Sequence, residues 1–211
     1  MKTILLIDSG YLRDIFKKER KFYNADGIEA LSHHIINTIN QTSPLSLLRI
    51  LFYDCKPFEG AIKLPISQQE KKFTVKDFTL NNLSARDYFA IRCGTLKFRG
   101  WNRKETSYQK QTVSDSDFEP SFEQKGVDMR IGLDIAQYAE DKSVDQIILI
   151  SNDTDCIPAM KFARRGGIVM SLVEFVTLTG EIKSHADRIY RVSFPSNNSK
   201  IKEFIPKNAR P

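Results

Sequence analysis

Runs of apolar residues at consecutive positions recur along the chain, and several of them end in an acidic residue. Apolar residues on both sides of a strand are typical of a parallel sheet that helices cover on both faces. The predicted strands are Lys2–Asp8, Leu48–Asp54, Tyr88–Leu96 with an edge partner around Leu96–Phe98, Asp145–Ser151, Ile168–Phe175 and Ile189–Phe194.

The segments between these strands have apolar residues three or four positions apart, which is the spacing of one face of a helix. The predicted helices are a short one after the turn Ser9–Tyr11, a long one opened by Asp26-Gly27, Gly126–Glu140, Ile157–Arg164 with Gly166-Gly167 as its stop signal, and a short one within Glu181–Asp187. Alternating strands and helices predict an α/β fold, a three-layer sandwich with a mainly parallel central sheet.

Other segments show no regular pattern. Cys55–Gln69 contains two prolines and is predicted to be a loop, and Gln68–Leu83 is predicted to be helical in part. Arg99–Glu123 is polar, carries both charge signs and is predicted to be an exposed loop. We therefore predict one domain over residues 1–194 and a basic, flexible tail over residues 195–211.

Composition narrows the class of protein. The 211 residues are 41% hydrophobic and 27% charged, which suits one globular domain and predicts no membrane span. The three cysteines are widely spaced and form no CxxC pair, so neither zinc nor a disulfide framework is expected. Asp8 interrupts the apolar start too early for a signal peptide, and with no membrane span predicted we expect a cytoplasmic protein. Any metal here would be held by oxygen. The net charge of +6 fits a polyanionic partner.

Acidic residues follow the predicted strands at the edge where open α/β sheets place their ligands. Asp8, Asp54 and Asp153 should meet there, with Asp155 and the helical Asp128 nearby. Carboxylates on a rigid edge suit Mg²⁺ or Mn²⁺, which lowers the pKa of a bound water and offsets charge on phosphorus. The alternative for each aspartate is a helix cap, and it is strongest for Asp155.

Two further aspartates are kept out of the predicted metal site. Asp134 lies six positions after Asp128, about 240° around the helix, so it should face elsewhere. Asp54 is expected to organise a loop rather than to bind a metal.

Cations near the acids could contact phosphates. Lys125, Arg130 and Arg164 are the candidates, and a solvated helix face is the alternative for each of them. Trp101 among Arg99, Arg103 and Lys104 combines an aromatic ring with cations, as single-strand binding often does, although an ordinary basic loop explains it slightly better.

Several other chemistries lack their motifs. The chain has no GxxxxGK[ST], no GxGxxG and no GxSxG, so a P-loop ATPase, a dinucleotide-binding enzyme and a serine hydrolase are unsupported.

The ordered set of motifs resembles the NYN domain of the PIN-like nuclease superfamily, and within it the bacterial LabA-like branch. The motifs are Asp8-Ser9-Gly10-Tyr11, Tyr53-Asp54, Pro57-Phe58-Glu59-Gly60, Arg92-Cys93-Gly94-Thr95-Leu96, Lys125-Gly126-Val127-Asp128, Ser151-Asn152-Asp153-Thr154-Asp155 with Pro158, and His185-Ala186-Asp187. The similarity extends to about Ser193. Asn152 and Cys156 depart from the family pattern, where a glycine and an aromatic residue are common.

This resemblance implies a Rossmannoid, PIN-like fold and a metal-dependent ribonuclease. Asp8, Asp128 and Asp153 would bind Mg²⁺ or Mn²⁺, and Asp155 would assist. The function expected from the sequence is therefore an endoribonuclease whose partner is RNA. A non-catalytic RNA-binding regulatory module and a small-molecule phosphoesterase are the alternatives, and a homodimer or a protein partner stays open.

Overall fold

The computed structural model describes residues 1–74 and 78–195. The described strands are β1 (Lys2–Asp8), β2 (Ser46–Cys55), β3 (Gly60–Lys63), β4 (Glu70–Phe73), β5 (Phe89–Arg103), β6 (Phe118–Lys125), β7 (Gln146–Ile150), β8 (Val169–Glu174) and β9 (Arg188–Arg191). The described helices are α1 (Ser9–Lys18), α2 (Ala25–Thr42), α3 (Phe78–Ser84), α4 (Val127–Glu140), α5 (Ile157–Arg165) and α6 (Gly180–Lys183), with 3₁₀ turns η1 (Glu105–Ser107), η2 (Asp115–Asp117) and η3 (Thr154–Cys156).

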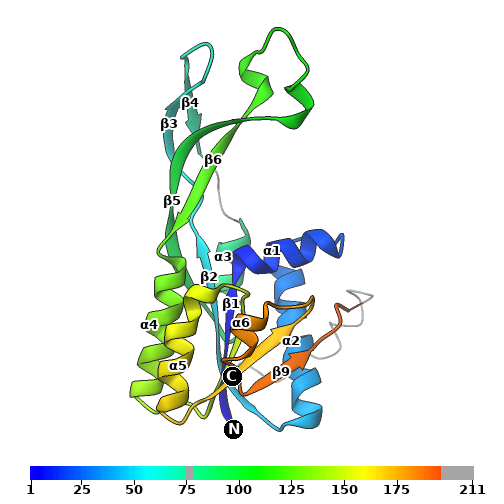
Figure 1. The fold of residues 1–211 in the computed structure, drawn as a ribbon, viewed down its shortest axis with the longest axis vertical. Helices are drawn as coiled ribbons and strands as arrows, with labels where there is room; N and C mark the ends of the chain where they lie inside the picture. The colour runs from blue at the N-terminus through cyan, green and yellow to red at the C-terminus, as the bar shows by residue number, and fades with distance from the viewer. Residues whose placement is uncertain (75–77, 196–211) are drawn as a thin grey trace.

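Among these residues, seven strands form one sheet in the order β6-β5-β2-β1-β7-β8-β9, and only the β5–β6 pair is antiparallel. Helices α4 and α5 cover one face, and α1, α2 and α3 cover the other (Figure 1). The predicted α/β sandwich with a mainly parallel sheet is confirmed.

The central strands are apolar at consecutive positions because both of their faces are covered. In β1, Ile4 and Leu6 pack towards α4 and α5, whereas Leu5 and Ile7 pack towards α1 and α2. All four are at most 1% exposed. Burying one such side chain stabilises a fold by about 1.5–3 kcal/mol, so the strands that carry the acidic edge are also the most firmly held.

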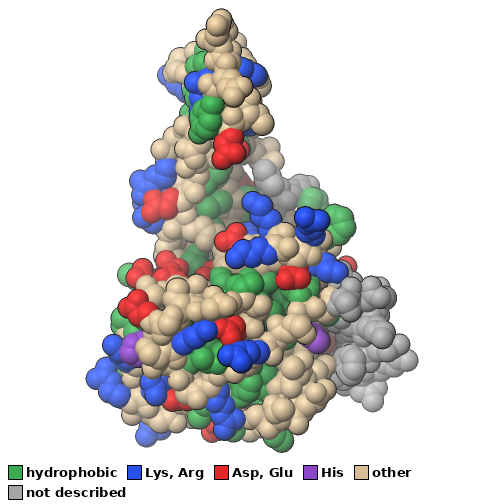
Figure 2. Space-filling view, turned by 45° about the vertical axis from the view of Figure 1, so that its right-hand side comes forward, with side chains coloured by type: hydrophobic (Ala, Val, Ile, Leu, Met, Phe, Trp, Pro, Cys, Tyr) green, Lys and Arg blue, Asp and Glu red, His purple; other side chains and the backbone are tan. Residues whose placement is uncertain are grey.

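A long projection rises from the sheet (Figure 1; Figure 2). We call it the arm and define it as residues 58–73 and 95–125, which contain the β3–β4 hairpin and the antiparallel part of β5 and β6. Rings from both hairpins meet inside it. Phe122 lies 5.2 Å from Phe58, 6.1 Å from Phe73 and 5.9 Å from Phe98 between ring centroids.

The arm corrects the prediction that Arg99–Glu123 is an exposed loop. Strand β5 continues to Arg103 and β6 begins at Phe118, so only the tip between them is irregular. The loop predicted over Cys55–Gln69 was also wrong in part, since it contains β3. The prediction that Gln68–Leu83 is helical in part is confirmed by α3, although this segment also contains β4. Polar residues could form these strands because the aromatic cluster joins segments that are distant in sequence.

Two smaller differences concern the ends of elements. Helix α1 begins at Ser9 directly, without the predicted turn, because the side chain of Asp8 caps it. The predicted tail lies outside the described residues from 196 onwards. Within the described ranges, no helix has both the length and the apolar character to cross a membrane.

Candidate active site at the acidic edge

The C-terminal ends of β1, β2 and β7 lie side by side. Asp8 is paired in register with Tyr53 of β2, and Ile7 with Ile150 of β7. The aspartates that follow these strands therefore gather at one edge of the sheet, where the arm meets the body and Figure 2 shows acidic side chains grouped.

Asp8 is half-buried and has a structural role as well as a place in this group. Its Oδ1 accepts hydrogen bonds from the backbone N–H of Gly10 at 2.9 Å and of Tyr11 at 3.5 Å, which caps α1. Its Oδ2 accepts a bond from the Ser151 hydroxyl at 3.0 Å. Burial raises the pKa of this carboxyl, its hydrogen bonds oppose that rise, and the charge of Asp153 adds to it.

Ser151, which is fully buried, joins the two strand ends. Its hydroxyl donates to Asp8 and accepts from the backbone N–H of Asp153 at 3.1 Å. One hydroxyl thus holds the segment after β7 beside the end of β1. Sequence reasoning assigned Ser151 no such role, although a serine between an apolar strand and an acidic pair was a visible signal.

Asp153 and Asp155 differ in their surroundings. The half-buried Asp153 caps the 3₁₀ turn η3 by accepting a bond from the backbone N–H of Asp155 at 2.9 Å. Asp155 is exposed, and it does not cap α5, whose cap residue is Cys156 without a side-chain bond. The cap interpretation therefore applies to Asp8 and Asp153 and not to Asp155.

Asp128 stands in the first turn of α4, and its carboxylate has no hydrogen-bond or ion-pair partner among the described residues. Burial raises its pKa first, and the charges of Asp153, Asp8 and Asp155 raise it further. Burial, and then the charges of the same four aspartates, raise the pKa of the Cys156 thiol to about 12, so this thiol lies near all four. The structure thus brings all four predicted acids into one electrostatic group.

The donor set of this group fits Mg²⁺ or Mn²⁺ in its chemistry, since it consists of carboxylate oxygens that repel one another and would gain from a cation. As the side chains stand, however, no three acidic, histidine or cysteine side chains in residues 1–74 and 78–195 are arranged to hold one ion. A metal would therefore have to draw the carboxylates together, and the partnerless Asp128 is the most easily moved.

The two aspartates kept out of the predicted metal site are engaged elsewhere. Asp54 is 2% exposed and forms an ion pair with Arg13 of α1. Asp134 accepts bonds from the hydroxyl of Tyr53 at 2.7 Å and from Nε of Arg92 at 3.0 Å, on a different side of α4 from Asp128.

The candidate cations separate into two places. Lys125 forms an ion pair with Glu123 directly before α4, and Nη1 of Arg130 donates to the carbonyl of Gly126 at 2.8 Å, so both lie near Asp128 in the chain. Arg164 stands in the last turn of α5, where its Nε bonds Asp187 at 2.8 Å. The structure does not bring Arg164 together with the aspartates, which precede the other end of α5.

Sequence reasoning also missed Glu174, a further acid at the end of a strand. It closes β8, is 9% exposed and pairs with both Lys183 and Arg191. These partners lower its pKa to about 2. Burial, with the charge of Glu174, raises the pKa of Tyr11 to about 12, so the two lie near each other. Its signal was the same as for Asp8: an acid that ends an apolar run.

Comparisons with known proteins bear on this edge. The family model for the NYN domain matches residues 65–193, which are 129 of the 211 residues. Asp128, Asp153 and Asp155 lie inside the match, and Asp8 precedes it. A search of curated proteins gave no match.

Two solved structures are similar in outline. One is a protein of unknown function from Vibrio parahaemolyticus, 14% identical, with 90% of this chain and 91% of that chain covered at a TM-score of 0.48. The other comes from a structure described as the basis for sirtuin substrate affinity, 10% identical, with 96% and 92% covered at 0.36. Likeness at this level carries no conclusion about function.

The family match covers more than half of the chain and includes three of the four aspartates at the acidic edge. NYN domains are typically ribonucleases. The chain belongs to the NYN domain family.

Proposed function

We propose that this protein is a Mg²⁺- or Mn²⁺-dependent endoribonuclease. The observation that carries the proposal is the coupling of four aspartates at one sheet edge, where burial and then the charges of the other three aspartates raise the pKa of Asp128. Like charges that lie close together destabilise a fold, and such groups are typical of functional sites. The NYN match supports cleavage of RNA as the function of this one.

In this proposal Asp8, Asp128 and Asp153 hold the ion, and Asp155 assists from an exposed position. A bound ion would supply a more acidic water and would offset charge on phosphorus. Ser151 positions Asp8 and Asp153 relative to each other through its two hydrogen bonds. Asp155 can accept a proton from the attacking water, and Lys125 and Arg130 can contact the RNA phosphates on the side of Asp128.

Several finer assignments belong to the same proposal. The motif set favours the LabA-like branch, and with it a bacterial protein that acts in the cytoplasm. RNA is the proposed partner, and a homodimer is not required by the site.

The test is incubation of labelled structured and single-stranded RNAs with and without Mn²⁺, using the wild-type protein and Asp153→Asn. Asparagine also caps helices, so the variant should keep the fold and lose the charge. Asp14→Asn, on the exposed side of α1, is the matched control. We expect cleavage that needs metal, survives in Asp14→Asn and is lost in Asp153→Asn. Cleavage that persists in EDTA or in Asp153→Asn would overturn the mechanism.

A non-catalytic RNA-binding module is the second candidate. It is favoured by the capping roles of Asp8 and Asp153 and by the absence, within the described ranges, of three side chains already arranged around an ion. It predicts RNA binding that is unchanged by EDTA, with no hydrolysis. Hydrolysis of a nitrophenyl phosphate without cleavage of RNA would instead indicate the phosphoesterase.

A further inference from the structure

The end of the arm has a pocket whose lining includes none of the four aspartates of the acidic edge. It measures about 680 Å³, within the range of pockets that hold small ligands. Its lining comes from the end of β5, the turn η1 and the start of β6, and consists of Trp101, Asn102, Arg103, Lys104, Glu105, Thr106, Tyr108 and Glu119. We call it the tip groove.

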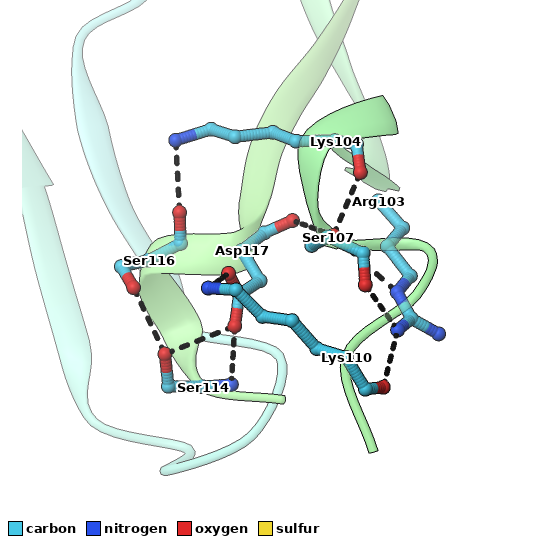
Figure 3. A network of polar contacts seen from close by, with 7 residues as sticks. All are labelled: Arg103, Lys104, Ser107, Lys110, Ser114, Ser116 and Asp117. Atoms are coloured by element: carbon cyan, nitrogen blue, oxygen red, sulfur yellow. Dashed lines mark hydrogen bonds and ion pairs between the residues drawn. The ribbon is translucent and has the colours of Figure 1, made fainter. Parts of the chain in front are cut away.

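The tip groove is built on a braced loop (Figure 3). Ser107 is fully buried, and its hydroxyl donates to the carbonyl of Lys104 at 2.7 Å. Arg103 reaches across the loop, with Nη2 at 2.6 Å from the carbonyl of Ser107 and 3.2 Å from that of Lys110. Asp117, 5% exposed, forms an ion pair with Lys110, which lowers the pKa of that carboxyl to about 2. The loop is therefore held in one shape rather than left free.

Two aromatic rings stand in this braced setting. Tyr108 is 62% exposed, and the guanidinium of Arg103 lies 5.9 Å from its ring centroid. The Trp101 indole N–H donates to the carbonyl of Lys63 at 2.9 Å, which fixes the ring against the β3–β4 hairpin. An exposed ring backed by an arginine, beside a fixed tryptophan, is the composition on which unstacked nucleic-acid bases stack.

The charged side chains of the tip groove indicate whether stacking or net charge would dominate binding there. Arg103 and Lys104 donate only to neutral oxygens of the described residues, so their charges stay available to a phosphate. Glu105 and Glu119 also line the groove and balance those two charges. Affinity there must therefore come from stacking more than from net charge.

Strand β6 links the tip groove to the acidic edge. Strand β6 runs from Phe118, beside the groove, to Lys125, two residues before α4 bears Asp128. Seven steps along a strand span about 23 Å. Gln124, near the base, lies 3.4 Å from Asp54, so the arm is anchored at the same edge as the four aspartates.

We propose that the tip groove binds an unstacked base of single-stranded RNA whose chain then follows the arm to the acidic edge. The inference rests on the proposed function and adds its substrate class: RNA with an unpaired stretch long enough to reach both places. Duplex RNA offers no free base faces, so it gains nothing from the groove.

The test is fluorescence anisotropy with a labelled uridine 20-mer and a 20-base-pair RNA duplex. It uses the full chain carrying Asp153→Asn so that RNA is not cut. We expect Tyr108→Ala to weaken 20-mer binding by about 5- to 100-fold and Tyr108→Phe, which keeps the ring, to restore it. Duplex binding and the salt dependence of 20-mer binding should change little, because no phosphate contact is removed.

Tyr88→Ala is the matched control, since Tyr88 is 47% exposed and lies just before β5, at the opposite edge of the sheet. With Asp153 intact, Tyr108→Ala should raise the KM for the 20-mer and leave kcat unchanged. Equal binding by Tyr108→Ala and its parent would overturn the groove as an RNA site. Absence of cleavage by the wild-type protein would instead contradict the proposed function, while the binding comparison would still decide the groove.

Discussion

The four aspartates make a specific prediction about stability: Asp128→Asn should stabilise the metal-free protein while it removes activity. Asp128 has no partner among the described residues and meets the charges of Asp8, Asp153 and Asp155. The amide keeps the size of the side chain and removes the charge, so only electrostatic terms change.

The magnitude follows from two opposing effects. Each of three like charges acting on an exposed, water-screened carboxylate costs about 0.2–1 kcal/mol, so relief of all three amounts to about 1.5 kcal/mol. An acid in the first turn of α4 also gains about 0.3–1 kcal/mol from the helix dipole, which asparagine forfeits. The net gain in the free energy of unfolding is about 0.5–1 kcal/mol, or a rise of about 1–4 °C in Tm for a domain of this size.

The direction of the pKa shift determines how the stability difference between Asp128→Asn and the wild-type protein depends on pH. Because the folded-state pKa of Asp128 lies above its ordinary value of 3.8, ionisation costs more in the folded than in the unfolded chain. This cost grows as the pH rises through the unfolded and then the folded pKa, and it disappears as the pH falls below 3.8. The advantage of Asp128→Asn should therefore be largest at neutral pH and should vanish near pH 3.

Thermal unfolding followed by far-UV circular dichroism in EDTA measures this difference, with Asp14→Asn as the control for a simple change in net charge. Adding Mn²⁺ should reverse the order, because the wild-type protein gains more from the ion than the variant does. A lower Tm for Asp128→Asn in EDTA, or an advantage that is the same at pH 3 and pH 7, would refute the repulsion argument.

Three further outcomes follow from individual contacts. Asp8→Ala should be about 1 kcal/mol less stable in urea than Asp8→Asn, because both variants lose the charge but only asparagine can still cap α1. Equal stability of the two variants would contradict the cap. Gly94→Ala should lower the free energy of unfolding in urea by about 1–3 kcal/mol, because its Cβ would lie 2.6 Å from the carbonyl oxygen of Lys125. An unchanged urea midpoint would show that the base of the arm can shift. Cys156 should resist a thiol reagent at pH 8 in the folded protein because burial and four acids raise its pKa to about 12, and rapid labelling mapped to that residue by mass spectrometry would count against the electrostatic group.

The elements that could be predicted are those whose own pattern decides their burial. Strands β1, β2 and β7 are apolar at consecutive positions, and helix α4 repeats apolar residues at helical spacing. The local sequence of each element therefore predicts that it is buried in the layered core. The acids that end those strands then meet because parallel strands share an edge. Glu174 obeys the same rule, and it escaped notice because the partners that hold it come from later segments of the chain.

The arm is the opposite case. Its strands are polar and partly exposed, and nothing local distinguishes them from loop. They form because Phe58, Phe73, Phe98 and Phe122 meet from segments up to 64 positions apart. A cluster of that kind has no signature within any one window of sequence.

The sequence by itself therefore determined the layered fold and the identity of the acids at its edge, because both depend on local pattern and on the direction of parallel strands. Only the tertiary structure decided how these acids divide their roles. Ser151 links Asp8 to Asp153, both of which also cap a turn or helix. Asp128 lies among like charges without a partner in residues 1–74 and 78–195. Such pairings depend on distances between chain segments, which folding sets and residue order does not state.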